Sequence, residues 1–103
     1  MLTHHTTLSH KVKQTLSMIQ QYQAKVGKQM HRLKGIREAS VVLSDLKKLA
    51  PILETERRNI FALHVEGDST TETEAKKHIK SAAKCLVKVI KCVKTAAKFT
   101  KSD

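Results

Sequence analysis

Residues that interrupt helices are almost absent from this chain, and their scarcity limits what it can fold into. Only three Gly and one Pro occur among 103 residues. Few turns are therefore available, which favours a small number of long elements. Apolar residues recur at three- and four-residue steps over most of the length, whereas β-branched residues do not alternate with polar ones. The long elements are therefore expected to be helices.

This spacing predicts three helical segments. The first, about residues 7–34, carries one apolar stripe interrupted at Gln23, and Gly35 is placed to end it. The second, residues 38–65, contains Pro51, which lacks a backbone N–H and predicts a break or a kink. Residues 66–71 are rich in turn-forming side chains and predict a loop.

The third helix, residues 71–100, has the most regular pattern. Thr71 and Glu74 have the spacing of a capping box, in which each side chain bonds to the other residue's backbone N–H. Apolar residues then follow at alternating steps of four and three, a heptad seam; they are Ile79, Ala83, Leu86, Ile90, Val93 and Ala97. Further apolar residues flank this seam, namely Ala82, Cys85, Val89, Cys92 and Ala96. The apolar sector is thus wider than one neighbouring helix needs, and a dimer would cover the excess.

Together these segments predict an all-α fold with a single domain over residues 1–103. We expect an antiparallel helical bundle of three long helices, the middle one broken or kinked near Pro51, that self-associates as a homodimer.

No stretch is apolar enough over about 18–20 residues to span a membrane, and the first residues lack the apolar part of a secretory signal. An intracellular protein of the cytoplasm or nucleus is expected, with a virus-encoded protein inside a host cell as an equal alternative. Tyr22 and Phe61 are expected in the core.

Charge is distributed unevenly along the chain. The net charge is +11 with histidines neutral, and residues 71–103 hold nine lysines but only three acids. No acid lies between Ala75 and Lys101. Like charges four residues apart on a helix destabilise it, so a face of one sign has no structural benefit of its own. The usual partners of so basic a chain are nucleic acid, an acidic protein or an anionic membrane.

Two basic clusters are the candidate binding residues. One lies late in the first helix and the other on the third; their members are Lys25, Lys28 and Arg32, and Lys77, Lys80, Lys84, Lys88 and Lys91. At about 1.5 Å per residue, the rise from Lys77 to Lys98 is about 31 Å, close to the roughly 34 Å of one duplex turn. Arg57 and Arg58 form a third, smaller cluster.

These residue types favour recognition of a nucleic-acid backbone. Lysine lacks the planar fork that reads guanine, and three aromatic residues are too few for stacking the bases of a single strand. The leading hypothesis is therefore sequence-independent binding of duplex phosphates, with double-stranded RNA or DNA preferred over single strands.

The alternative belongs to another class, a helical interaction module. Its amphipathic C-terminal helix would dock an acidic protein partner or, as a less favoured option, an anionic membrane. Lysines facing solvent along one surface favour nucleic acid, whereas lysines around an open apolar groove favour a helical partner.

The sequence carries no motif typical of catalysis or cofactor binding. The sequence has no glycine-rich phosphate loop, no GxSxG and no histidine or cysteine spacing typical of zinc sites. We expect a protein that is not an enzyme and that uses no cofactor or metal. Cys85 and Cys92, seven residues apart on one helix, lie too far apart to pair with each other. They are expected to be free thiols in the core or at an interface, with a disulfide between two subunits as the lesser alternative.

Overall fold

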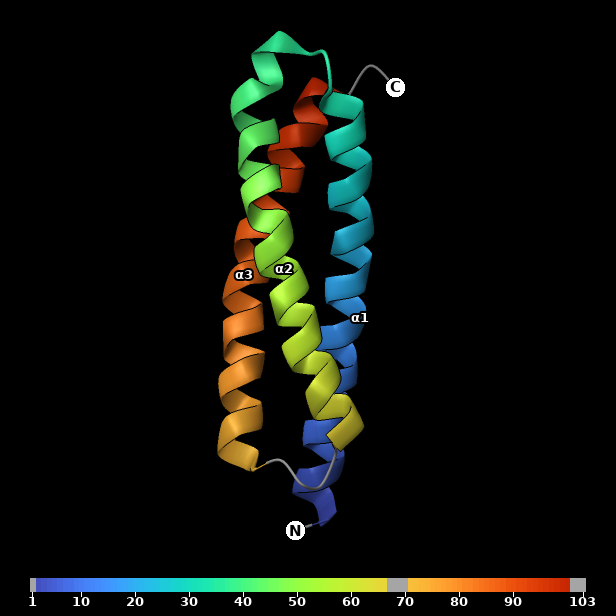
Figure 1. Ribbon diagram of the computed structural model, residues 1–103. Coiled ribbons are helices and arrows are strands. Elements are labelled where there is room, and N and C mark those ends of the chain that lie inside the picture. Colours follow the sequence, from blue (N-terminus) through green and yellow to red (C-terminus); the bar gives the residue numbers. More distant parts are fainter. Residues whose placement is uncertain (1, 67–70, 101–103) are drawn as a thin grey trace.

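Three long helices packed side by side make up this protein (Figure 1). The computed structural model describes residues 2–66 and 71–100, with side chains from Leu8 onward. The helices are α1 (Leu2–Leu33), α2 (Ser40–Glu66) and α3 (Glu72–Phe99), and a 3₁₀ turn, η1 (Arg37–Ala39), leads into α2. The bundle measures 53 × 22 × 18 Å. The predicted all-α antiparallel bundle of three helices is confirmed, and no strand occurs within the ranges just given.

The helix ends agree with the sequence signals at most positions. Gly35 has a φ of 85°, a left-handed conformation that favours glycine, and it ends α1 as predicted. The Thr71 hydroxyl accepts a hydrogen bond of 3.2 Å from the backbone N–H of Glu74, which is the first half of the predicted capping box. α1 begins at Leu2, earlier than the predicted Thr7, because no Gly or Pro stops the helix there. Of the predicted loop, residues 67–70 lie outside the described residues.

α2 runs through Pro51 without interruption. The predicted break is therefore wrong, while the kink stays a prediction. Pro51 is exposed, and so is Lys47, whose carbonyl loses its helical hydrogen bond to the proline. Water can reach that carbonyl, which lowers the cost of a proline inside the helix.

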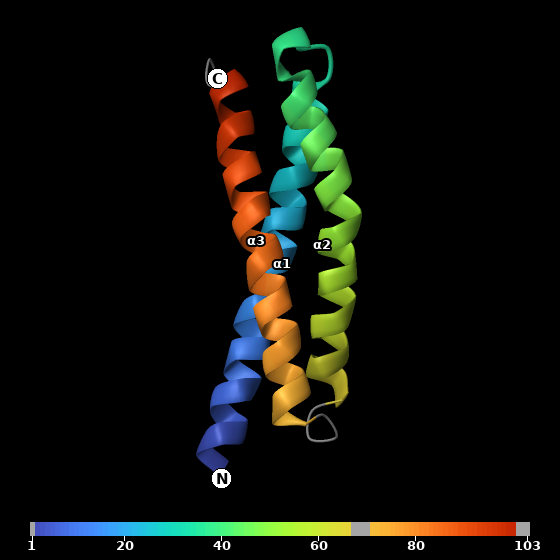
Figure 2. The same cartoon turned by 90° about the vertical axis from the view of Figure 1, so that its left-hand side faces the viewer.

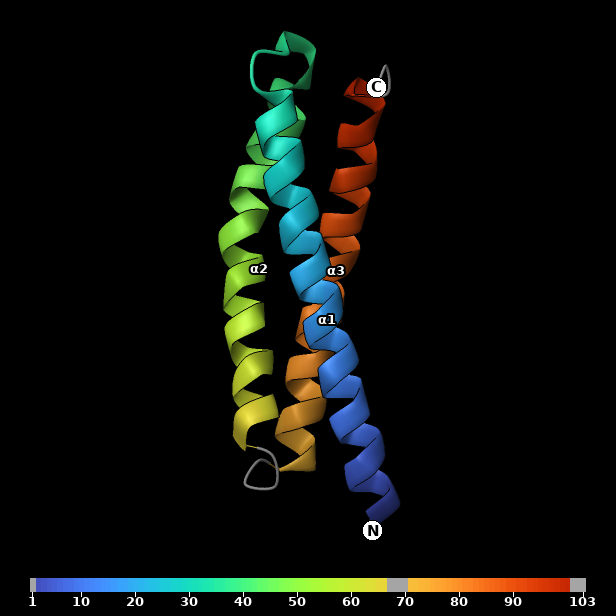
Figure 3. The same ribbon diagram turned by 90° about the vertical axis from the view of Figure 1, so that its right-hand side faces the viewer.

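The core runs along the bundle axis, and each helix packs against the other two (Figures 2 and 3). Its largest fully buried side chains come from all three helices; they are Ile19, Leu33, Leu46, Leu53, Ile60 and Val89. Tyr22 is half-buried against this core, whereas Phe61 is 45% exposed, so the prediction that Phe61 is a core residue is wrong. Ile60 takes the core position, and the next residue points about 100° away from it around the helix.

The buried side of α3 differs from the predicted seam. Its buried residues are Ala75, Ala82, Cys85, Leu86, Val89 and Ala96, whereas Ala83 and Ala97 are exposed. The residues expected to flank the seam thus form the centre of the buried side of α3. α3 packs against two neighbours, so its buried sector is centred between them, about 70° around the helix from the predicted line. α1 and α2 cover the wide apolar sector of α3 that had suggested a dimer. Self-association therefore stays a prediction, and that sector no longer supports it.

Candidate nucleic-acid interface

α3 presents a lysine face, which we define as the eight lysines from Lys76 to Lys98. All of them are exposed; they are Lys76, Lys77, Lys80, Lys84, Lys88, Lys91, Lys94 and Lys98. At about 100° per residue they lie on the side of α3 opposite Ala82 and Val89, which are fully buried. The core therefore orients this face toward solvent, as predicted for Lys77, Lys80, Lys84, Lys88 and Lys91.

Almost none of this charge is paired. Glu72 Oε1 lies 2.9 Å from Lys76 Nζ at the start of α3. Within residues 2–66 and 71–100, no carboxylate lies within ion-pair distance of the other seven lysines. Their mutual repulsion is therefore not offset within the bundle, and a polyanion would relieve it.

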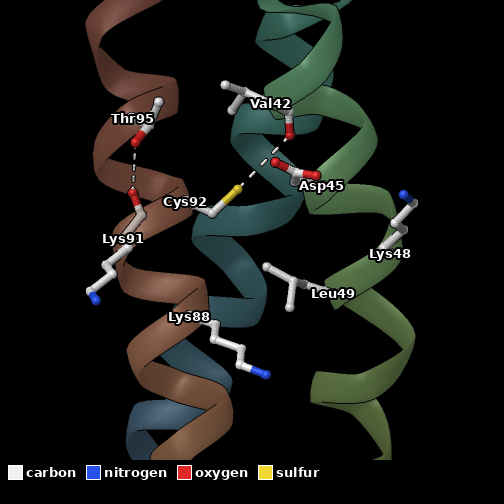
Figure 4. Close-up of a pocket in the computed structure, with 8 residues that line it drawn as sticks. All are labelled: Val42, Asp45, Lys48, Leu49, Lys88, Lys91, Cys92 and Thr95. Carbon is white, nitrogen blue, oxygen red and sulfur yellow. Dashed lines mark hydrogen bonds between the residues drawn. The ribbon is translucent and has the colours of Figure 1, made fainter.

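The α1 cluster is exposed. Lys25, Lys28 and Arg32 all face solvent, and the Lys25 ammonium lies 4.7 Å from the centroid of the Tyr22 ring, a cation–π contact. On α3, Lys88 and Lys91 border the α2 side of the helix (Figure 4).

The third basic cluster is neutralised in part. Arg57 binds the Glu54 carboxylate through two hydrogen bonds, from Nε at 2.7 Å and from Nη2 at 2.9 Å, and Arg58 adds one at 3.2 Å. The hydrogen bond from Arg57, with those from Gln23 and Arg58, lowers the pKa of Glu54 to about 2. The same pairing raises the pKa of Arg57. This cluster is a structural ion-pair network, in contrast to the lysine face.

A groove lies beside the lysine face, between the first half of α2 and the last half of α3, with a volume of about 460 Å³. We call it the α2–α3 groove. Val42, Leu49 and Cys92 supply its apolar lining, and the Cys92 thiol lies 3.9 Å from the Val42 carbonyl oxygen (Figure 4). The lysines at this groove are Lys48, Lys88 and Lys91, and Asp45 and Thr95 complete it.

Lys48 is a residue that sequence reasoning missed. It lies in the first half of α2, next to Lys47, and nothing in the local pattern separates the two. Only the antiparallel pairing of α2 with α3 places it at the same groove as Lys88. Knowledge of that pairing was the one signal that could have found it.

Both cysteines are free, with Cys85 buried and Cys92 half-buried. Burial raises the pKa of the Cys85 thiol, with a further rise from Glu56, and burial and Asp45 likewise raise the pKa of Cys92. Both are therefore thiols at neutral pH and weak nucleophiles. Among the described residues, no three His, Cys, Asp or Glu side chains come together as metal ligands would.

Comparison of this chain with protein families, with curated proteins and with solved structures found no match. None of the helices, over the part of the chain that the structure describes, is both long and apolar enough to cross a bilayer. A functional assignment must therefore rest on the surfaces described above.

Proposed function

We propose that this protein binds the phosphate backbone of a nucleic-acid duplex through the lysine face of α3, as a binding protein and not as an enzyme. One observation carries the proposal: eight exposed lysines follow one another on the outside of a packed helix, with no acid between them. Arrayed lysines neutralise phosphates and release counterions, which gives affinity without sequence preference. Such a partner is present in the cytoplasm and the nucleus.

The geometry of the lysine face favours a duplex over a single strand. The face extends about 31 Å from Lys77 to Lys98 along one continuous helix, at about 1.5 Å per residue. Its opposite side is held by the core, so the charges are arrayed on a rigid rod. Stacking of unpaired bases needs several aromatic side chains on one surface. The exposed ones here, Phe61 and Phe99, belong to different helices.

The α1 cluster has a secondary role in this proposal. Lys25, Lys28 and Arg32 are exposed, but they are three residues on α1, against the eight lysines on α3. They would contact phosphates of a second duplex segment or add to non-specific attraction.

A homodimer, which would present two lysine faces to one duplex, is a further part of the proposal. Sedimentation velocity with and without duplex tests it, and a single monomeric species in both would overturn that part.

The test is a fluorescence-anisotropy titration with random-sequence duplex RNA, duplex DNA and single strands. If six to ten phosphates are neutralised, affinity falls about 10³- to 10⁵-fold between roughly 50 and 200 mM salt. The variant Lys84→Glu/Lys88→Glu should lose most of the duplex binding. Its matched control is Lys11→Glu/Lys13→Glu, which makes the same charge change at two exposed positions of α1 outside both clusters.

Two outcomes would contradict the proposal. Equal losses in the two variants would show that net charge alone attracts the duplex. No binding of any nucleic acid at the lower salt concentration would remove nucleic acid as the partner.

The helical-partner alternative rests on one observation, the lysines at the α2–α3 groove. As inferred from the sequence, such a partner would dock on the apolar side of α3. That side is buried against α1 and α2, so docking a helix or a membrane there would require the bundle to open. The exposed lysine face needs no such rearrangement, and for this reason we favour nucleic acid.

A further inference from the structure

We infer that the α2–α3 groove is a second binding site, for a single-chain aliphatic anion such as a medium-chain fatty acid. This inference does not depend on nucleic-acid binding. It rests on an apolar lining, on the positive charge beside it, and on dimensions that suit a single chain.

The apolar part of the groove comes from both helices. Val42 and Leu49 lie two turns apart on α2, and Cys92 faces them from α3. Ile52, which is 50% exposed, follows Leu49 by three residues and continues the same flank of α2. An aliphatic chain laid along these residues would be removed from water, and each buried methylene would add to binding.

The dimensions exclude larger occupants. A volume of about 460 Å³ lies within the roughly 300–1,000 Å³ of small-molecule sites. The distance from Val42 to Leu49 along α2 is about 10 Å at 1.5 Å per residue. A docked helix is itself about 10–12 Å wide and uses anchors over at least two turns, so it would rest on the surface without filling the groove.

The charges select an anion with one negative group. Lys48, Lys88 and Lys91 line the groove, and none of them is ion-paired within the described part of the chain. Asp45 lies among them and leaves a net charge of two positive units. The Lys88 ammonium points toward the groove, while those of Lys48 and Lys91 extend along the outer sides of α2 and α3 (Figure 4). A carboxylate head group would therefore lie nearest Lys88, with longer-range attraction from Lys48 and Lys91, whereas a cationic head group would be repelled by them. Asp45 would disfavour a head group with several negative charges.

The test uses the full chain and three amphiphiles that have the same ten-carbon tail, each below its micelle concentration. They are decanoate, the neutral decyl maltoside and the cationic decyltrimethylammonium. Calorimetry should detect decanoate binding, with much weaker binding of the other two. Octanoate should bind about four- to fifteen-fold more weakly than decanoate, because two methylenes are lost from a partly to fully covered chain. Equal binding of all three head groups, or none of decanoate, would overturn the inference.

Cys92 supplies a second readout from inside the groove. It is half-buried and lines the site, whereas Cys85 is buried in the core. Decanoate should slow the alkylation of Cys92 by N-ethylmaleimide, followed by peptide mass spectrometry, and should leave the rate at Cys85 unchanged. An unchanged rate at Cys92 under saturating decanoate would place any binding elsewhere and overturn the inference.

Variants connect the binding to named residues. Lys48→Ala should weaken decanoate binding about three- to tenfold, whereas the matched control Lys80→Ala, on the outer part of the lysine face, should leave it unchanged. Thr95→Trp places a large side chain at an exposed position of the groove, so it should block the ligand while circular dichroism stays that of the wild type. Equal effects of Lys48→Ala and Lys80→Ala would contradict the site. Duplex binding of Lys48→Ala, measured in parallel, separates failure of this inference from failure of the proposed function.

Discussion

The side-chain amide of Gln23 on α1 donates a hydrogen bond of 2.8 Å to the carboxylate of Glu54 on α2. Gln23 is the residue at which the apolar stripe of α1 is interrupted, so this polar position has a partner on the neighbouring helix. Arg57 holds the same carboxylate with two further bonds. The three residues form a partly buried bridge between α1 and α2.

The bridge predicts a specific dependence of stability on pH. The pKa of Glu54 is lowered from 4.5 to about 2 in the folded protein. Its contribution to stability is therefore fully present above pH 4.5 and is lost as the pH falls toward about 2. We expect Glu54→Gln to lower the melting temperature at pH 7, and the difference from the wild type to close between these pH values. Thermal melts followed by circular dichroism test this.

The matched control is Glu38→Gln, which removes an exposed acid outside the bridge. It should change the melting temperature at pH 7 less than Glu54→Gln does. A difference between Glu54→Gln and the wild type that is as large at pH 2 as at pH 7 would contradict the assigned role of Glu54.

The two described glycines should respond to alanine in opposite directions. At Gly27 an added Cβ meets no atom within 4 Å, and the residue lies inside α1. Gly27→Ala should therefore stabilise the protein by about 0.5–1 kcal/mol. Gly35 has a positive φ, so Gly35→Ala should destabilise it by about 1 kcal/mol or more. Urea unfolding of both variants checks the pair, and changes of the same sign would contradict it.

Ser81 on α3 satisfies part of a buried carboxylate on α2. Its hydroxyl donates a hydrogen bond of 2.8 Å to Glu56 Oε2, while Glu56 Oε1 has no partner and the residue is only 9% exposed. Ser81→Ala should cost about 1–3 kcal/mol, because it removes this donor from a buried acid. The double variant Glu56→Leu/Ser81→Ala should recover most of that loss, because neither polar partner remains. A double variant less stable than Ser81→Ala would argue that Glu56 itself stabilises the fold.

Thr71 should stabilise the start of α3. Its hydroxyl caps the backbone N–H of Glu74, so Thr71→Ala should lower the free energy of unfolding by about 0.5–2 kcal/mol. Thr73→Ala, two residues later at an exposed position in the first turn, is the matched control and should have little effect. Both values come from urea denaturation. Equal losses would show that the cap contributes nothing specific.

Local patterns were enough to predict much of this protein. The three helices, the end of α1 at Gly35 and the exposure of the lysine face agree with the sequence, because each depends on residues within one or two helical turns. The buried stripe of α1 was also correct, since a helix with one core-facing side shows a single apolar line. The stripe of α3 was displaced, because its apolar residues cover a sector wide enough for more than one line, and the buried centre of that sector depends on where both neighbours lie.

The sequence by itself thus determined the number of helices, the end of α1, the start of α3 and the charge of each helix. Only the tertiary structure decided which groups from different helices meet. Gln23 and Glu54 are 31 residues apart, Glu56 and Ser81 are 25 apart, and Val42 and Cys92 are 50 apart. These contacts give Gln23 a partner, supply Glu56 with a hydrogen-bond donor and bring together the two sides of the α2–α3 groove. They depend on the register between helices, which side-chain packing across the core sets and which no local spacing encodes.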